Sequence, residues 1–324
     1  TGMDNVRNIM GCPVSGLSPK EKVDAYSLVK MLNEHIVGNP EFSNLPRKFN
    51  ITLSGCPDDC VHAETQDLAL VPAVLEKNGD SVYGFNILVG GKLGSGGYRI
   101  ASPLDVFLCP EEVVKVCSAL ILLYRDNGSR DVRSKNRLAF LIQDWGEEKF
   151  RMELEESLGT SLTRAGVDLR GNEKSEHIGA YRQKQTSMNY VGLKIPVGRI
   201  QAAKLKELAR LAEKYGNEEI RFSHSNSLVI PNVSDQKLGD MLEEPVVKEF
   251  SYHPSSVLRG LVSCVGSDYC NLAAIETKSM ALKVAEQLEG KLPDTAPINM
   301  HWSGCPAACG NHLVADIGLL GKKM

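Results

Sequence analysis

The sequence predicts an α+β fold built on an internal pseudo-twofold repeat. Two short motifs occur twice, in the same order and at nearly the same separation. In each copy a helix-like stretch and a strand-like run lie between the two motifs. Two similar units are therefore expected in one chain, with a group bound near the axis that relates them. The 324 residues suffice for two or three domains, each with its own core.

The first copy starts at Arg7–Cys12 (RNIMGC) and closes with Ser54–Cys60 (SGCPDDC). Apolar residues at helical spacing around residues 26–32 predict a helix between these motifs. The run Phe49–Leu53 (FNITL) predicts a strand just before the second motif. A further helix is expected after the copy, at residues 111–126.

The second copy repeats this order. It starts at Arg259–Cys264 (RGLVSC) and closes with Ser303–Cys309 (SGCPAAC). A helix is predicted around residues 280–288, and the run Ile298–Trp302 (INMHW) predicts the strand.

The chain between the copies divides into two parts. Residues 159–189 are polar and without apolar period, which predicts a connection. From Tyr190 a strand is expected at 191–196, then a helix at Ala202–Tyr215 and two short strands within 219–230.

The cysteines predict a metal centre in the second copy. Cys264 and Cys270 form a C-x5-C pair, and Cys305 and Cys309 form a C-x3-C pair, whereas the first copy has Ser18 where a counterpart of Cys270 would fall. Structural zinc usually takes tighter pairs, so the spacing favours a 4Fe-4S cluster and leaves zinc as the alternative.

The other five cysteines are expected to be structural. Cys12, Cys56 and Cys60 are interpreted as packed remnants of the repeat, with a second metal site as the alternative. Cys117 falls on the apolar stripe of the helix at 111–126, and core packing is expected for it and for Cys109.

The contexts of the four cysteines, RGLVSCVGSDYCNLAAIETK and HWSGCPAACGNHLVADIGLLG, resemble the siroheme-binding nitrite and sulfite reductases, in particular the ferredoxin-dependent nitrite reductases. The first copy agrees through NVRNIMGCPVSG, LPRKFNITLSGC, HAETQDLALVPA and GFNILVGGKLG. Matching stretches are spread over nearly the whole chain. The resemblance implies a siroheme, a 4Fe-4S cluster and the six-electron reduction of nitrite to ammonium, with reduction of sulfite to sulfide as the alternative.

The resemblance also implies a domain order. A first siroheme and cluster type domain is expected at 1–157, a linker at 158–189, a ferredoxin-like half-domain at 190–256 and a second siroheme and cluster domain at 257–324. A half-domain precedes the second copy but not the first. The first copy continues well beyond its second motif, whereas the sequence stops soon after the second motif of the second copy. The chain is therefore expected to be a fragment of a longer reading frame.

Site residues follow from the same resemblance. It implies that Cys264, Cys270, Cys305 and Cys309 hold the cluster, and that Cys309 is also the proximal ligand of the siroheme iron. By motif position, Arg7 and Lys48 resemble the residues that bind the anion and supply protons. Arg47 is expected to meet a siroheme carboxylate.

Two further features refine this assignment. Asn50 stands where the sulfite enzymes tend to carry a second lysine, which favours nitrite, the less highly charged anion. The glycine-rich turn with Gly90, Gly91 and Lys92 is expected to lie against the siroheme, with Lys92 near a carboxylate.

Composition limits the remaining possibilities. A chain that is 42% hydrophobic and 24% charged, with a net charge of −3, is neither disordered nor a globally basic nucleic-acid binder. No run is long enough for a membrane helix, so a cytoplasmic protein is expected.

Ferredoxin is the expected electron donor, because Gly90-Gly91-x-x-Gly94 is not a nucleotide-binding fingerprint. The basic segment 125–137 is a candidate landing site for it. The alternative from another class is a metal-stabilised structural or electron-carrier protein without siroheme.

Overall fold

The computed structural model describes residues 4–77, 79–94, 96–172, 174–289, 291–292 and 297–322. The chain divides into two compact units, which are described separately. Unit 1 comprises Thr1–Gly16 and Lys20–Ser175, and unit 2 comprises Leu17–Pro19 and Glu176–Met324. None of the described helices is both long and apolar enough to span a membrane.

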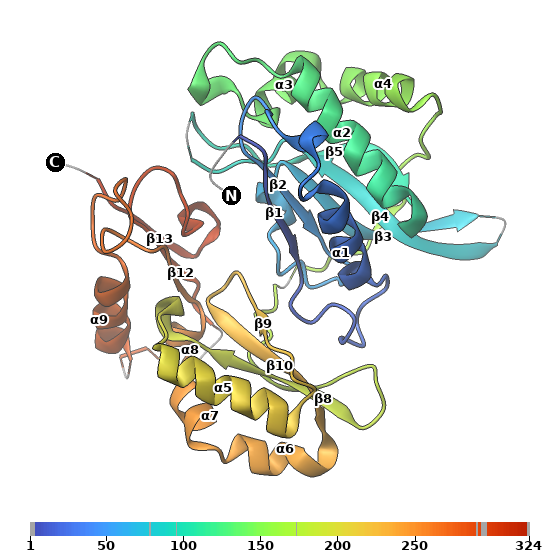
Figure 1. Ribbon diagram of the computed structural model, residues 1–324. Helices are drawn as coiled ribbons and strands as arrows, with labels where there is room; N and C mark the ends of the chain where they lie inside the picture. The colour runs from blue at the N-terminus through green and yellow to red at the C-terminus, as the bar shows by residue number, and fades with distance from the viewer. Residues whose placement is uncertain are drawn as a thin grey trace. The chain divides into compact units, whose positions relative to one another are not determined.

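Unit 1 is a six-stranded mixed sheet with helices packed on one face (Figure 1). The strand order is β1-β2-β3-β4-β5, and β6 pairs with β3. Strands β1, β2 and β3 run parallel, and the other pairs are antiparallel. Its elements are β1 (Val6–Gly11), α1 (Ala25–Ile36), β2 (Phe49–Leu53), β3 (Leu68–Lys77), β4 (Asp80–Val89), β5 (Ser102–Leu108), α2 (Val113–Asn127), α3 (Leu138–Trp145), α4 (Glu147–Leu158) and β6 (Val167–Asp168), with short 3-10 helices η1 (Pro40–Phe42), η2 (Ala63–Thr65), η3 (Pro110–Glu112) and η4 (Arg133–Lys135).

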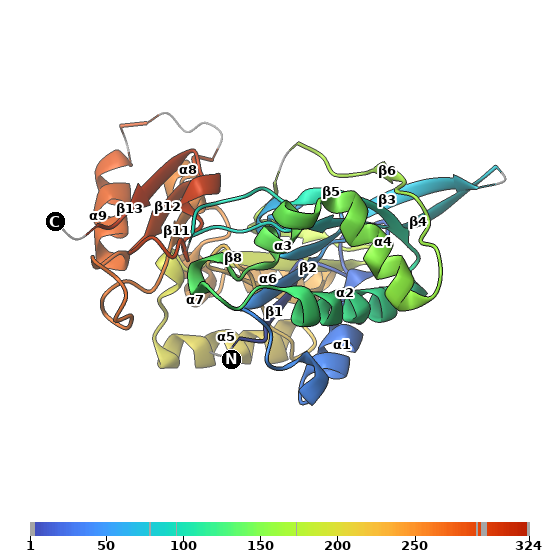
Figure 2. The same cartoon turned by 90° about the horizontal axis from the view of Figure 1, so that it is seen from above.

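Strand alternation separates the two faces of this sheet. Leu68 and Leu70 of β3 point into the main core, which the apolar faces of α1, α2, α3 and α4 complete (Figure 2). Ala69 and Val71 point to the other face and join a smaller apolar cluster. Helix α1 begins at the N-cap Asp24, whose carboxylate accepts a hydrogen bond from the Tyr26 amide.

Unit 2 contains two sheets. The first is a four-stranded antiparallel sheet of order β7-β8-β10-β9, whose core is closed by α5, α6 and α7. The second is a three-stranded parallel sheet of order β11-β12-β13, packed with α9. The elements are β7 (Gly179–Arg182), β8 (Met188–Lys194), η5 (Pro196–Gly198), α5 (Ala202–Tyr215), β9 (Arg221–Phe222), β10 (Ser227–Ser234), α6 (Asp235–Leu242), α7 (Pro245–Phe250), α8 (Ser256–Arg259), β11 (Leu261–Ser263), α9 (Lys278–Leu288), β12 (Met300–Ser303), η6 (His312–Val314) and β13 (Ile317–Leu320).

The internal repeat is present in the backbone. The order β1-α1-β2-η2-β3 in unit 1 recurs as β11-α9-β12-η6-β13 in unit 2, with parallel pairing in both. The Asn50 amide donates to Asp67 over 2.9 Å, and at the equivalent positions the Asn299 amide donates to Asp316 over 2.9 Å. Even this strand-edge contact is thus duplicated.

Most predicted elements occur where the sequence placed them, and the α+β class is confirmed. Strand β2 and helix α5 have the predicted bounds. Strand β12 begins at Met300 rather than at Ile298, whose amide instead bonds to Ser256.

Two predictions were wrong in part. The segment 159–189 is not a bare connection, because it contains β6 and β7. Both strands are short and polar, so they lack an apolar period. Cys117 is fully buried, but Cys109 is only half-buried, because it precedes η3 at the end of β5 rather than lying inside a helix. The domain bounds stay a prediction.

Candidate functional site

The four cysteines of the second copy lie in two neighbouring loops of unit 2. Cys264 directly follows β11, and Cys305 and Cys309 follow β12. Because β11 and β12 are parallel neighbours, their carboxyl ends meet at the same edge of the sheet. The Ala274 amide donates to the Gly304 carbonyl over 2.7 Å, which ties the two loops together. The fold therefore gathers both predicted pairs at one edge.

The four sulfur atoms differ in exposure. Cys264, Cys270 and Cys305 are half-buried, and Cys309 is exposed. Two loops that carry C-x5-C and C-x3-C pairs fit a 4Fe-4S cluster, as the sequence spacing predicts.

A backbone donor already points at one of these sulfur atoms. The Gly304 amide donates to the Cys264 Sγ over 3.1 Å. A Cβ at Gly304 would lie 3.0 Å from the Ala273 Cβ and 3.5 Å from that Sγ, so a side chain here would crowd the loop. Amide donors stabilise thiolate charge, as cluster ligation requires.

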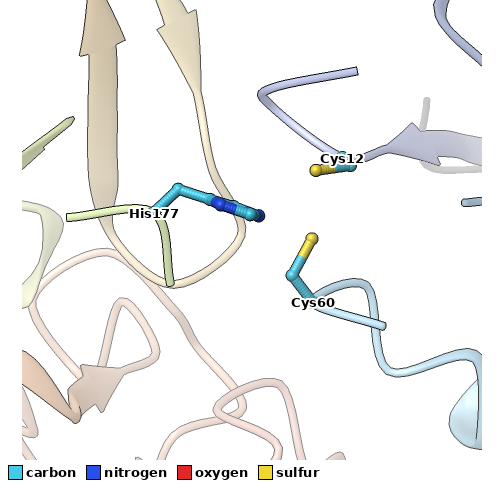
Figure 3. A group of neighbouring side chains, drawn as sticks. All are labelled: Cys12, Cys60 and His177. Atoms are coloured by element: carbon cyan, nitrogen blue, oxygen red, sulfur yellow. The ribbon is translucent and has the colours of Figure 1, made fainter. Parts of the chain in front are cut away.

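The three cysteines of the first copy are buried, as the packing interpretation predicts. Figure 3 shows the thiols of Cys12 and Cys60, which follow β1 and β2 within unit 1. A hydrogen bond with Cys12, then burial, raises the pKa of the Cys60 thiol well above its ordinary value, and Cys56 adds to the effect. Protonated, buried thiols are packing groups. His177, also drawn in Figure 3, belongs to unit 2.

Arg7 occupies a special position on β1. The register of β1 against β2 shifts between Val6 and Asn8, so Arg7 is the extra residue of a β-bulge. Val6 and Ile9 both pack against the core, although three residues apart, because the bulge resets the alternation. The bulge takes Arg7 out of the regular alternation of β1. The half-buried side chain of Arg7 interacts with nearby charged groups.

These charges are mostly cationic. Burial, then repulsion from Arg47, lowers the pKa of the Arg7 guanidinium, and Arg137 and Arg133 act in the same direction. Asp4 opposes them and accepts hydrogen bonds from Arg47 over 3.0 Å and from Arg133 over 2.9 Å. Two carboxylates, Asp4 and the Arg137 partner Asp67, stand among four guanidinium groups, so the local field stays positive and attracts anions.

Lys48 and Asn50 lie at the start of β2, beside this group. Phe49 and Ile51 are fully buried in the core on the helix-covered face. Since successive side chains alternate, Lys48 and Asn50 point to the opposite face. Both are half-buried. The order of the strands brings Arg7, Lys48 and Asn50 together at the amino ends of neighbouring strands.

A buried ion pair holds this edge in place. Arg137 donates to both carboxylate oxygens of Asp67, over 2.8 and 2.7 Å, and both residues are buried. Asp67 also accepts the Asn50 amide. Burial alone would lower the pKa of Arg137, but Asp67 outweighs it and raises the pKa. Arg137 is therefore buried and cannot form part of the candidate landing site in the basic segment 125–137.

The glycine-rich turn at Gly90 and Gly91 packs closely against other residues of unit 1. A Cβ at Gly90 would lie 2.6 Å from the Arg99 Nη1, and one at Gly91 would lie 2.6 Å from the Gln66 carbonyl oxygen. Lys92 is buried, donates to the Gly96 carbonyl over 2.9 Å and lies over a phenyl ring. Burial, then Arg137, lowers the pKa of Lys92. Packing within unit 1 explains these glycines, and their contact with siroheme stays a prediction.

Several residues around these groups were missed by sequence reasoning. Asp67 pairs with Arg137, Thr277 lies beside Cys264, and Lys278 donates to the Val197 carbonyl. Their partners are distant along the chain. The only sequence signal was that each stands next to a motif of the repeat.

A repeated parallel unit with cysteine loops in one copy and a cationic strand edge in the other defines a redox protein that binds an iron–sulfur cluster. The model described as "Nitrite and sulphite reductase 4Fe-4S domain" matches residues 2–162, and "Nitrite/Sulfite reductase ferredoxin-like half domain" matches residues 181–246. The chain belongs to the nitrite and sulphite reductase family. Membership implies siroheme and a 4Fe-4S cluster as cofactors. The four cysteines discussed above lie outside both matched ranges.

Individual relatives agree with this assignment. The chain is 44% identical over its whole length to a ferredoxin–nitrite reductase of Synechococcus elongatus, and 44% identical over 99% of its length to the chloroplastic enzyme of Zea mays. It spans 64% and 58% of those two proteins. The structure of the Mycobacterium tuberculosis NirA protein matches with a TM-score of 0.91 at 31% identity, over 99% of this chain and 59% of that one.

Proposed function

We propose that the chain is part of a ferredoxin-dependent nitrite reductase that reduces nitrite to ammonium with six electrons. The observation that carries the proposal is the pairing of two separate features. Four accessible thiols stand at one edge of the sheet in unit 2, and a group of cations surrounds Arg7 in unit 1. The names of the relatives supply the substrate and the donor.

The cofactor ligands follow from the cysteine loops. Cys264, Cys270, Cys305 and Cys309 would hold the 4Fe-4S cluster, and Cys309 would also hold the siroheme iron. Cys309 is the exposed member of the four, which suits a sulfur shared by two groups. When bound, the two cofactors supply single electrons at an iron that can take an anion.

The cationic edge of unit 1 supplies binding and protons. Arg7 would orient the oxyanion, because a guanidinium stays charged and donates several hydrogen bonds. Lys48 would donate protons as oxygen leaves. Arg47 and Lys92 would meet siroheme carboxylates, with Gly90 and Gly91 giving the turn its close packing.

Asn50 favours nitrite over sulfite as the substrate. It lies on the same face as Lys48 and adds no charge to the group around Arg7. A singly charged anion needs fewer cations than a doubly charged one. Reduction of sulfite is the second candidate.

We propose ferredoxin as donor, docking on the exposed part of the basic segment. Arg130, Arg133 and Lys135 are exposed and suit an acidic partner. The odd number of cysteines, nine in 324 residues, is unlike a disulfide framework and supports a reducing cytoplasmic compartment.

The test is anaerobic purification followed by visible spectroscopy and turnover with reduced ferredoxin. We expect siroheme and cluster absorption, and faster turnover of nitrite than of sulfite. Cys305→Ser should lose cluster iron, whereas Cys56→Ser, the same change at the equivalent position of the first copy, should retain it. A colourless protein with stoichiometric zinc would refute the proposal and favour a structural metal protein.

A further inference from the structure

The loop that carries Cys305 and Cys309 is closed at its base by one serine hydroxyl. Ser303, the last residue of β12, is buried, and its Oγ accepts a hydrogen bond from the Gly310 amide over 3.1 Å. The Nδ1 of His312 lies 2.9 Å from the same oxygen atom. These contacts join the strand before the loop to two residues after it, so both cysteines stand on a tethered segment.

The direction of these hydrogen bonds determines the role of the imidazole. The Gly310 amide is the donor in its bond, so Ser303 must place its own hydroxyl proton on another group. Buried hydroxyl groups are almost always paired. In the part of the chain that the structure describes, the His312 Nδ1 is the acceptor within hydrogen-bond distance of this hydroxyl. His312 Nδ1 is therefore the acceptor, and Nε2 carries the proton of the neutral ring.

The loop needs such a tether because its backbone is strained. Ala308 and Asn311 have φ values of 59° and 53°, in the left-handed region that favours glycine. Gly310 lies between them, and a Cβ there would come within 2.2 Å of the Trp302 carbonyl oxygen. Glycine at this position thus lets the backbone approach β12 closely enough for its amide to reach Ser303.

The first copy of the repeat has the same strained backbone but a different tether. Asp59 and His62, at the positions equivalent to Ala308 and Asn311, have φ values of 40° and 51°. The Asp59 carboxylate accepts a hydrogen bond from the Ala63 amide over 3.2 Å, which closes the turn from within.

The side chains at the two ends of that contact are exchanged in the second copy. Ala308 stands where the first copy has Asp59 and offers no side-chain acceptor. His312 stands where the first copy has Ala63 and supplies an imidazole instead. Because the strained backbone is kept while the carboxylate is lost, the contact between Ser303 and His312 replaces the missing tether.

We propose that Ser303 and His312 are positioning residues that hold the loop with Cys305 and Cys309 in the conformation that receives the 4Fe-4S cluster. The inference rests on the cluster ligation proposed above. Both cysteines must face the cluster at the same time, and a loop that is fixed in advance loses less conformational entropy on binding. The tether should therefore slow the loss of cluster iron.

The test measures how fast the anaerobically purified holoprotein loses its cluster to an iron chelator, from visible absorbance and released iron. His312→Ala removes the acceptor, and we expect iron loss to become on the order of tenfold faster. His312→Asn places Oδ1 where Nδ1 stood and should restore the slow rate, whereas His312→Gln lengthens the side chain and should not. His253→Ala changes an exposed histidine of the same unit and should leave the rate unchanged.

A double-mutant cycle separates this hydrogen bond from general destabilisation. Ser303→Ala should accelerate iron loss at least as much as His312→Ala, and adding His312→Ala to it should change little, because both remove the same contact. If His312→Ala binds no iron at all, the comparison of His312→Asn with His312→Gln decides. Equal rates in those two variants, or an unchanged rate in His312→Ala, would overturn the inference. An unmodified protein without iron and without visible absorption would overturn the proposed function instead.

Discussion

At the scale of single residues, position rather than residue type decides which cations are accessible and which are buried. Arg7 is the extra residue of a bulge and does not follow the alternation of β1. Lys48 follows the alternation of β2 and points to the face opposite the core. Arg137 carries the same guanidinium as Arg7 but is buried against Asp67. A buried, bidentate pair of this kind orders a strand edge and is unavailable to a substrate.

Asn50 gives the first prediction at this scale. Replacing it with lysine adds a cation beside Lys48 on the same face of β2. The added charge should bind the more highly charged anion more strongly, so we expect the ratio of sulfite to nitrite kcat/KM to rise at least several-fold. The gain will be smaller if burial partly neutralises the new lysine.

The control for this variant is Asn127→Lys at the end of α2. Helix α2 covers the opposite face of the sheet, so the same added charge there should leave the ratio unchanged. A ratio that stays constant or falls in Asn50→Lys with intact siroheme would show that Asn50 does not discriminate between the two anions.

At the scale of elements, a buried lysine connects the two sheets of unit 2. Lys194 ends β8 and donates to the Ser225 carbonyl over 3.0 Å and to the Leu261 carbonyl of β11 over 2.9 Å. It is fully buried. The antiparallel half-domain is thus tied to the cysteine-bearing sheet through one ammonium group.

This connection predicts a pH dependence of stability. Burial lowers the pKa of Lys194 to about 8, with Arg259 contributing in the same direction and Glu176 opposing. Between about pH 8 and pH 10.5 the unfolded chain keeps this proton and the folded chain does not, so the group increases the free energy of unfolding as pH rises through that window. The gain relative to Lys194→Met should reach about 3 kcal/mol by the upper end.

Urea unfolding of both proteins at several pH values between 7.5 and 10.5 measures this difference. Lys206→Met, an exposed lysine on α5, is the matched control and should follow the unmodified protein. Parallel curves for the unmodified protein and Lys194→Met would contradict the prediction.

At the scale of the whole molecule, the two copies of the repeat share a topology but differ in the length of their described strands. In unit 1 the repeat is extended by β4 and β5, and β3 pairs with β4 along ten residues. In unit 2 the described sheet β11-β12-β13 has strands of three or four residues, and β13 is largely exposed. Metal ligation is therefore expected to stabilise the second copy far more than the first.

Removal of iron with a chelator tests this expectation. Hydrogen exchange of peptides covering β11 and β12 should become at least tenfold faster, because a ligand that binds only the folded state stabilises it by mass action. Peptides covering β3 and β4 should exchange as before. Equal acceleration in both units, or none in either, would contradict a cluster held by Cys264, Cys270, Cys305 and Cys309.

The sequence by itself determined the elements and the repeat, because these depend on local signals. Apolar period sufficed for α5, and a short β-rich run sufficed for β2. The two cysteine pairs follow neighbouring strands, so their presence in two loops was predictable from the motifs. Short polar strands such as β6 and β7 were not predicted from the sequence, because they carry no apolar period.

Only the tertiary structure decided which charges meet. Asp67 and Arg137 are seventy positions apart. Lys278 donates to the carbonyl of Val197 in η5, which lies 81 positions earlier in the sequence. Such partners depend on the order of strands and on the packing of distant segments, neither of which a local pattern contains. For the same reason a guanidinium that the sequence shows as one of several basic residues becomes either a half-buried member of a cationic group, as at Arg7, or a buried partner of a carboxylate, as at Arg137.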